Sequence, residues 1–139
     1  MRSLEDTFPA AGSAAGGRPE QVLVVDDEPL VRHFAARVLV EEGYAVHEAG
    51  DGLEAMAILE SGRSVDCVVS DVVMPRLDGV KLLEALAVRQ PGLPVILMSA
   101  YGTAQLAEQG IAAPCAVLRK PFAPERLVEE VRRCIAPRT

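Results

Sequence analysis

Short runs of apolar residues alternate with amphipathic stretches over most of the chain. Five runs, rich in Val, Ile, Leu and Ala, predict β-strands at residues 21–25, 45–49, 66–70, 94–99 and 115–119. Several of these runs are continuously apolar, which is typical of strands covered on both faces of a parallel sheet. The pattern therefore favours buried parallel strands.

Between these runs, apolar residues recur at helical spacing and predict five helices. The first begins at Pro29, because proline is well tolerated in the first helical turn, and Gly43 follows its end. The others are expected at about 53–59, from 79 to before Pro91, at about 103–109, and after Pro124. The residues expected to face the core are Leu30, Phe34, Val38 and Leu39 in the first helix, Val80, Leu83 and Leu86 in the third, and Leu127, Val128, Val131 and Ile135 in the last.

The order of these elements predicts the fold class. Strands that alternate with helices through short connections imply right-handed crossovers, each of which places a helix on one face of a sheet. We predict an α/β domain at residues 21–136, with a doubly wound, five-stranded parallel sheet flanked by five helices. Residues 1–20, rich in Ala, Gly, Pro and Ser, are expected to form a flexible tail or linker, and residues 137–139 a C-terminal tail.

Composition narrows the functional classes. The chain has 139 residues, a formal net charge of −6 and a pI near 4.9, which argue against direct nucleic acid binding. Apolar runs fall short of the ~18 residues of a membrane span, and residues 1–6 do not resemble a secretory signal, so we expect no membrane insertion. Cys67, Cys115 and Cys134 lack metal-ligand spacing. We expect them to be reduced, partly buried thiols in a cytoplasmic protein.

Polar residues follow four of the predicted strands. The first strand is followed by Asp26 and Asp27 and the third by Asp71, while the fourth ends in Ser99 and the fifth is followed by Lys120. In an open α/β sheet, ligands bind where the carboxyl ends of the strands meet. Three carboxylates, a hydroxyl and an ammonium group would then share one crevice. Such a set suits a divalent cation and a phosphoryl group.

Each of these residues alone has a simpler structural explanation. Asp26 or Asp27 would be a helix N-cap, and Asp71 a turn residue before a proline-containing loop. Lys120 alone is most often a solvated charge, and Ser99 alone a cap at a strand end. The functional hypothesis therefore depends on the five residues occurring together.

From about residue 21 to residue 135, the chain resembles the receiver domain of bacterial two-component response regulators, which has the flavodoxin-like fold of the chemotaxis regulator. The motifs that carry the resemblance are Val24-Val25-Asp26-Asp27-Glu28, Ser70-Asp71-Val72-Val73-Met74-Pro75, Asp78-Gly79, Met98-Ser99 and Arg119-Lys120-Pro121-Phe122. Jointly, in this order and at these spacings, they are highly specific, whereas any one alone is weak.

The resemblance implies a role for each carboxylate. Asp71 would be the phosphoacceptor and would form an aspartyl phosphate. Asp27, Asp71 and the backbone carbonyl of Val73 would bind Mg²⁺ (or Mn²⁺), and Asp26 would act on the metal through water. The cation would relieve the repulsion among these acids and shield the incoming phosphoryl oxygens.

The resemblance also assigns the remaining polar positions. Lys120 would meet a phosphoryl oxygen as a point charge, and Ser99 would hydrogen-bond another and move toward it on phosphorylation. The peptide bond before Pro121 is expected to be cis. Asp78-Gly79 is a turn signal that lets the loop after the phosphoacceptor fold back.

The implied function is regulatory and not enzymatic. The domain would take a phosphoryl group from a histidine kinase or histidine phosphotransfer protein and shift a two-state equilibrium in its partner-binding face. A phosphorylation-independent interaction module on the same fold is the first alternative. A Mg²⁺-dependent aspartyl-phosphate phosphatase is disfavoured, because such enzymes carry Asp-x-Asp after the first strand and residues 26–29 do not. A receiver homodimer stays open, as does a stand-alone regulator or a receiver from a larger chain such as a hybrid kinase.

Three positions depart from the family pattern or flank its site. Val117 stands where receivers usually carry Tyr or Phe, three residues before the site lysine, so the usual movement of an aromatic ring is in doubt. Val73 and Tyr101 lie two residues beyond Asp71 and Ser99, with no amide or carboxylate to orient an attacking water. We therefore expect a comparatively long-lived acyl phosphate and an unusual output surface.

Overall fold

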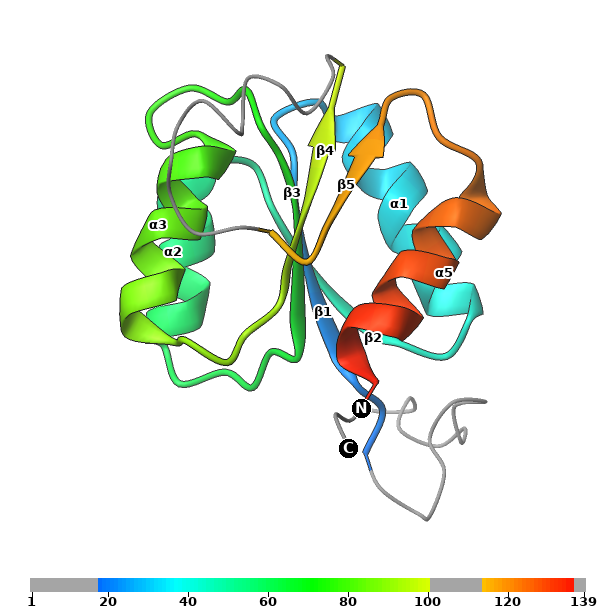
Figure 1. Cartoon of the computed structure of the whole chain (residues 1–139), viewed down its shortest axis with the longest axis horizontal. Coiled ribbons are helices and arrows are strands. Elements are labelled where there is room, and N and C mark those ends of the chain that lie inside the picture. Colours follow the sequence, from blue (N-terminus) through cyan, green and yellow to red (C-terminus); the bar gives the residue numbers. More distant parts are fainter. Residues whose placement is uncertain (1–17, 101–113, 137–139) are drawn as a thin grey trace.

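The computed structural model describes residues 18–100 and 114–136 of the chain, and within them the strands form one parallel sheet. The strand order is β2-β1-β3-β4-β5, which is a doubly wound order (Figure 1). The strands are β1 (Gln21–Val25), β2 (Ala45–Ala49), β3 (Cys67–Asp71), β4 (Val95–Ser99) and β5 (Ala116–Arg119). Each lies within one residue of its predicted bounds.

Helices cover both faces of the sheet. The described part of the chain contains α1 (Pro29–Glu41), α2 (Gly52–Glu60), α3 (Gly79–Arg89) and α5 (Pro124–Ile135). Helices α1 and α5 lie on one face, and α2 and α3 lie on the other (Figure 1). The helix predicted at 103–109 lies outside the described residues, as does Tyr101. The flanked parallel sheet is confirmed for the elements that the structure describes.

The core consists of two apolar clusters separated by the sheet. On β1, Val22 and Val24 belong to the cluster beneath α1 and α5, while Leu23 and Val25 belong to the cluster beneath α2 and α3. Successive side chains of a strand point to opposite faces, so a strand covered on both sides must be apolar at every position. This explains the continuous apolar runs in β1, β3 and β4, whose residues are almost all buried.

The predicted inner face of α1 is wrong in its first turns. Leu30 is 85% exposed and Phe34 is 45% exposed, whereas Ala35, Ala36 and Leu39 are buried. The prediction favoured large apolar residues, but the small side chains of the two alanines face the sheet. On α3, Val80 is only half-buried and Leu82 is buried with Leu83 and Leu86.

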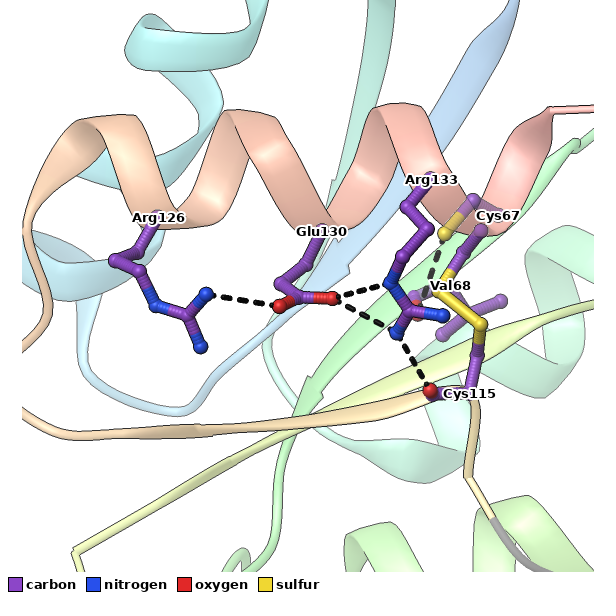
Figure 2. Close-up of a disulfide and its surroundings, with 7 residues drawn as sticks. Cys67, Val68, Cys115, Arg126, Glu130 and Arg133 are labelled. Atoms are coloured by element: carbon purple, nitrogen blue, oxygen red, sulfur yellow. Dashed lines mark hydrogen bonds and ion pairs between the residues drawn. A yellow bond between two sulfur atoms is a disulfide. The ribbon is translucent and has the colours of Figure 1, made fainter.

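The expectation of three reduced thiols is also wrong. Cys115, just before β5, and Cys134, near the end of α5, form a disulfide, whereas Cys67 is a buried free thiol (Figure 2). Helix α5 runs back along the sheet and brings its last turn beside the start of β5 (Figure 1). The 19-residue separation along the chain gives no sign of this proximity, because it depends on how α5 packs.

Candidate functional site

The parallel register brings the polar strand ends to one edge of the sheet. Val25 pairs with Ser70, Asp71 with Met98, and Ser99 with Arg119. The next residues along β1 and β5 are Asp26 and Lys120. The four strand ends that the sequence singled out therefore meet at the carboxyl edge of the sheet.

Three carboxylates converge at this edge. One side-chain oxygen each from Asp26, Asp27 and Asp71 lie within 4.8 Å of one another. Asp26 is completely buried and Asp71 is 8% exposed, while Asp27 is exposed and opens the cluster to solvent. Hard oxygen ligands that surround one point, with one side open to water, suit a divalent cation that keeps part of its hydration shell. The donor set therefore fits the expected metal.

Lys120 places a positive charge among these acids. Its Nζ lies 3.0 Å from Oδ2 of Asp26 and 3.2 Å from Oδ1 of Asp71. Burial alone would lower the pKa of Lys120, but the hydrogen bonds and charges of the two aspartates raise it above its usual value. The ammonium group is therefore held in its charged form. It bridges an acid from β1 and an acid from β3.

The Asp71 carboxyl is held in an unfavourable electrostatic environment. Burial and the neighbouring charge of Asp26 raise its pKa above the usual value, and Lys120 opposes the shift only in part. A raised pKa means that the folded chain resists the charged form of Asp71. A divalent cation would offset this cost, because it adds positive charge beside the same carboxylates.

The backbone around Asp26 is fixed by several hydrogen bonds. Its Oδ1 accepts from the backbone N–H of Glu28 at 2.9 Å, and its own N–H donates to the carbonyl of Ala49 at 3.1 Å. Arg32 on α1 donates to the backbone carbonyl of Asp26 at 2.8 Å. These hydrogen bonds fix Asp26 to β2, to the residue before α1 and to α1 itself.

The loop after β3 is held close behind Asp71. Asp78 caps α3 by accepting from the backbone N–H of Lys81 at 2.9 Å, and the N–H of Gly79 donates to the carbonyl of Val72 at 2.9 Å. A Cβ on Gly79 would lie 2.3 Å from the backbone oxygen of Asp71. Any larger residue at position 79 would displace this backbone, which gives a physical reason for the turn signal at Asp78-Gly79.

The other predicted site residues have different surroundings. Ser99 is 4% exposed at the end of β4, and its carbonyl accepts from the N–H of Lys120 at 2.8 Å. Val73 is 65% exposed in the loop after β3. Val117 is half-buried on β5 and packs against the cluster beneath α2 and α3. The Lys120–Pro121 peptide bond is cis, as predicted.

Asp51 and Arg76 support the site and were not identified from the sequence. Asp51, 9% exposed, caps α2 by accepting from the N–H of Glu54 at 2.9 Å, and it also pairs with the Arg76 guanidinium. Arg76 lies in the loop after β3 and has a φ of 70°, which is uncommon for a residue other than glycine. This clasp between Asp51 and Arg76 holds that loop against α2. The Asp51-Gly52 pair before a helical run was the available signal for the cap.

The clasp predicts a specific loss of stability. Asp51→Ala should lower the free energy of unfolding by about 1–2 kcal/mol, because it removes the cap and leaves Arg76 without its partner. The Glu54 amide and Arg76 lower the pKa of Asp51 in the folded chain. The contribution of the Asp51 carboxylate to stability is therefore fully present above its unfolded pKa near 3.9, and it is lost as the pH falls through the lower folded pKa.

Urea unfolding near neutral pH and in acid measures this difference. The matched control is Asp78→Ala, which removes an equivalent cap hydrogen bond to Lys81 on α3. If Asp51→Ala lowers the free energy of unfolding no more than Asp78→Ala does, the contact between Asp51 and Arg76 adds nothing to stability.

A doubly wound sheet with acids and a lysine at its carboxyl edge is the architecture of phosphoacceptor switch domains. The family model described as response regulator receiver domain matches residues 22–132, and the chain belongs to this family. Members of this family act as regulatory phosphoacceptor switches in two-component signalling, and the carboxylate cluster is compatible with the divalent metal such switches use.

Curated relatives place the domain in larger proteins. The chain is 39% identical over 136 residues to the sensor kinase CckA of Brucella abortus, a match that covers 96% of the chain and 14% of the kinase. It is 38% identical over 119 residues to TcrX of Mycobacterium tuberculosis, described as a probable transcriptional regulatory protein, covering 85% of the chain and 50% of that protein. The chain thus spans half or less of these two relatives.

Solved receiver structures share the fold. The receiver domain of NtrX from Brucella abortus has a TM-score of 0.75 at 32% identity, and the match covers 82% of this chain and 97% of that one. The response regulator TrrA from Thermotoga maritima, solved with Mg(2+)-BeF, has a TM-score of 0.74 at 30% identity, covering 83% and 98%. In the described residues, no helix has the length and apolar character needed to cross a membrane.

Proposed function

We propose that Asp71 is the phosphoacceptor of this receiver domain and that Mg²⁺ is the metal it uses. The observation that carries the proposal is the convergence of Asp26, Asp27 and Asp71 around one point, with Lys120 within 3.2 Å of Asp71. Among the three acids, Asp71 is nearly buried, lies in contact with the Lys120 ammonium group and has the exposed Asp27 beside it. The backbone carbonyl of Val73 is the further metal ligand we propose.

The residues of the chain would divide the chemistry among them. The bound metal would neutralise charge on the phosphoryl oxygens. An oxygen of Asp71 attacks phosphorus in line, an O–P bond forms, and the bond to the donor nitrogen or oxygen breaks. Lys120 remains charged because Asp26 and Asp71 raise its pKa, so it is ready to pair with a phosphoryl oxygen. Ser99 would hydrogen-bond another of these oxygens.

An apolar surface beside the site supports a protein donor. Leu30, Val31, Phe34, Pro121 and Phe122 line an open hollow of about 440 Å³ that reaches Lys120. The rings of Phe34 and Phe122 lie 6.4 Å apart. Exposed apolar area next to a reactive group is typical of a protein interface.

We infer that the donor is a histidine kinase or a histidine phosphotransfer protein, acting in the cytoplasm. Pairing of two receivers and output through a larger chain are consistent with this assignment. An acidic chain of net charge −6 is not expected to bind nucleic acid itself. The domain would be regulatory, and its chemistry would be limited to its own phosphorylation and dephosphorylation. We propose residues 21–136 as the bounds of the domain.

Phosphorylation by a small donor tests the proposal. Incubated with Mg²⁺ and acetyl phosphate, the protein should gain one phosphoryl group by intact mass, and a chelator should abolish the gain. Lys120→Gln should reduce the yield at equal metal concentration, because one positive charge beside Asp71 is lost.

The decay rate in the same samples tests whether Val73 and Tyr101 leave the acyl phosphate long-lived. Rapid decay that Tyr101→Ala leaves unchanged would contradict this.

Val117 favours one alternative. Its small apolar side chain is half-buried against the core and cannot supply the aromatic movement of other receivers. The domain could therefore signal by binding alone. If the folded protein binds Mg²⁺ yet gains no phosphoryl group from acetyl phosphate or from a histidine kinase, the phosphorylation-independent interaction module is the better assignment.

A further inference from the structure

The disulfide ties together two elements at the end of the sheet opposite the acids. Cys115 immediately precedes β5 and Cys134 lies in the last turn of α5, with Cα atoms 6.1 Å apart (Figure 2). The two cysteines are 19 positions apart, and Lys120 lies between them. Lys120 lies five positions after Cys115, or about 16 Å along an extended chain. The cross-link is thus at the start of β5, whereas Lys120 follows the end of the same strand.

The two cysteines differ in exposure. Cys134 is 6% exposed and belongs to the apolar cluster beneath α1 and α5. Cys115 is half-buried, and both cysteines line an open hollow of about 590 Å³ together with Pro94 and Ile135. A small thiol can therefore approach the disulfide from this hollow, and Cys115 is the more exposed of the two cysteines.

The third cysteine does not compete for the pairing. Cys67 on β3 is completely buried in the same cluster as Cys134, and burial raises the pKa of its thiol to about 12. The thiolate is the form that attacks a disulfide, so a thiol held protonated near neutral pH exchanges very slowly. The structure therefore defines a single pair, Cys115 with Cys134.

The junction does not depend on the disulfide alone for its shape. The N–H of Cys115 donates to the carbonyl of Val95 at 2.7 Å, and the Arg133 guanidinium donates to the carbonyl of Cys115 at 2.9 Å. Glu130 pairs with Arg133 and, one turn earlier on α5, with Arg126 (Figure 2). The Arg133 contact joins α5 to the chain just before β5 whether or not the sulfur atoms are bonded, and the Val95 contact fixes Cys115 to β4. The cysteines would stay adjacent after reduction and could pair again.

We propose that Cys115 and Cys134 form a reversible redox modification site that, when oxidised, locks β5 to α5. A thiolate of a small dithiol attacks Sγ of Cys115, and Cys134 leaves as a thiolate and takes a proton. The second thiol of the dithiol then displaces Cys115. Two electrons pass from the dithiol, which becomes a cyclic disulfide, to the two cysteines. A disulfide of the same class reverses the reaction. This site is independent of phosphoryl transfer to Asp71.

The oxidised form should be the more stable form and should keep a working acid cluster. Closing a segment of this length restricts the unfolded chain, and we expect the oxidised protein to melt about 10 °C above the reduced protein. Mg²⁺ affinity should change by less than about twofold, because Asp26 and Asp71 lie at the carboxyl ends of β1 and β3, whereas the bond lies at the start of β5. In a reducing compartment the pair would be open, and oxidation would close it.

Thiol counting and melting curves on the full chain test the proposal. The protein is equilibrated with reduced and oxidised dithiothreitol in graded ratios, alkylated under denaturing conditions and weighed. One alkylated cysteine at the oxidising end and three at the reducing end are expected, with peptide mapping assigning Cys67 as the free residue. Cys115→Ser and Cys134→Ser should each abolish the redox dependence of the melting temperature. Cys67→Ala should preserve it.

Several outcomes would overturn the proposal. Three free thiols at the oxidising end would show that the pair does not form, and a bond to Cys67 or between two chains would show that the pairing is wrong. A difference below about 2 °C between the melting temperatures of the oxidised and reduced protein would show that the bond does not stabilise the contact of β5 with α5. Phosphorylation by acetyl phosphate, measured on both forms, reports the function of Asp71 separately. Its failure alone would therefore not bear on the redox site.

Discussion

Asp71→Asn should abolish phosphoryl gain and make the metal-free protein more stable. The amide cannot serve as the nucleophilic carboxylate, so no phosphoryl group should appear even after long incubation. Burial and the charge of Asp26 raise the pKa of Asp71, which means that its ionised form destabilises the folded chain. The neutral amide removes this cost while keeping a similar shape. A loss of function and a gain in stability are therefore expected from one substitution.

The pH dependence follows from the direction of the shift. Because the folded pKa of Asp71 lies above the unfolded value near 3.9, the folded chain keeps the proton longer. Stability then falls as the pH rises from that value through the folded pKa, and it stays reduced above it. The advantage of Asp71→Asn should be present at pH values above the folded pKa of Asp71 and should shrink as the pH falls through it, because the native carboxyl then becomes protonated too.

Thermal melts in a chelator measure this effect, with Asp27→Asn as the matched control. Asp27 is the exposed acid of the cluster and contributes least to the raised pKa of Asp71, so its amide should stabilise the metal-free protein less. Added Mg²⁺ should raise the melting temperature of the native protein more than that of Asp71→Asn. An amide variant that is less stable than the native protein at neutral pH would contradict the electrostatic account.

The sequence predicted the sheet and its carboxyl edge because both follow from local patterns. β3 and β4 are covered on both faces, so burial imposes the unbroken apolar runs that mark them. Parallel register then fixes where the polar residues that end each run must meet. Asp26, Asp71 and Lys120 could for this reason be grouped before any distance was known, and the structure places them together.

The features that the sequence did not predict depend on contacts between separate elements. The clasp of Asp51 and Arg76 joins the start of α2 to a loop 25 residues later, and either residue alone has the pattern of a surface charge. Leu30 is exposed because it lines a surface hollow with Pro121 and Phe122, outside the two core clusters. The Cys115–Cys134 pair depends on the angle at which α5 crosses β5. Periodicity carries no information about such angles.

Gly79→Ala should damage the site without touching a side chain in it. The added Cβ would lie 2.3 Å from the backbone oxygen of Asp71 and 3.1 Å from its carbonyl carbon. These are backbone atoms of a central strand, so the strain must move the end of β3 or the start of α3. We expect a cost of about 1–3 kcal/mol in stability. Because a displacement of about 1 Å can cost roughly a hundredfold in rate, phosphorylation should slow by about that factor.

Gly92→Ala is the matched control, because a Cβ there has no atom within 4 Å and the backbone has no left-handed conformation. It should leave the phosphorylation rate unchanged and alter stability by less than about 1 kcal/mol. Rates of acetyl phosphate transfer at saturating Mg²⁺, with Mg²⁺ affinity and melting temperature on the same samples, separate misplacement from unfolding. A folded Gly79→Ala that transfers at the native rate would show that Asp71 tolerates movement of its backbone. The position of the nucleophile would then depend on Lys120 and the metal, and not on the close contact between β3 and α3.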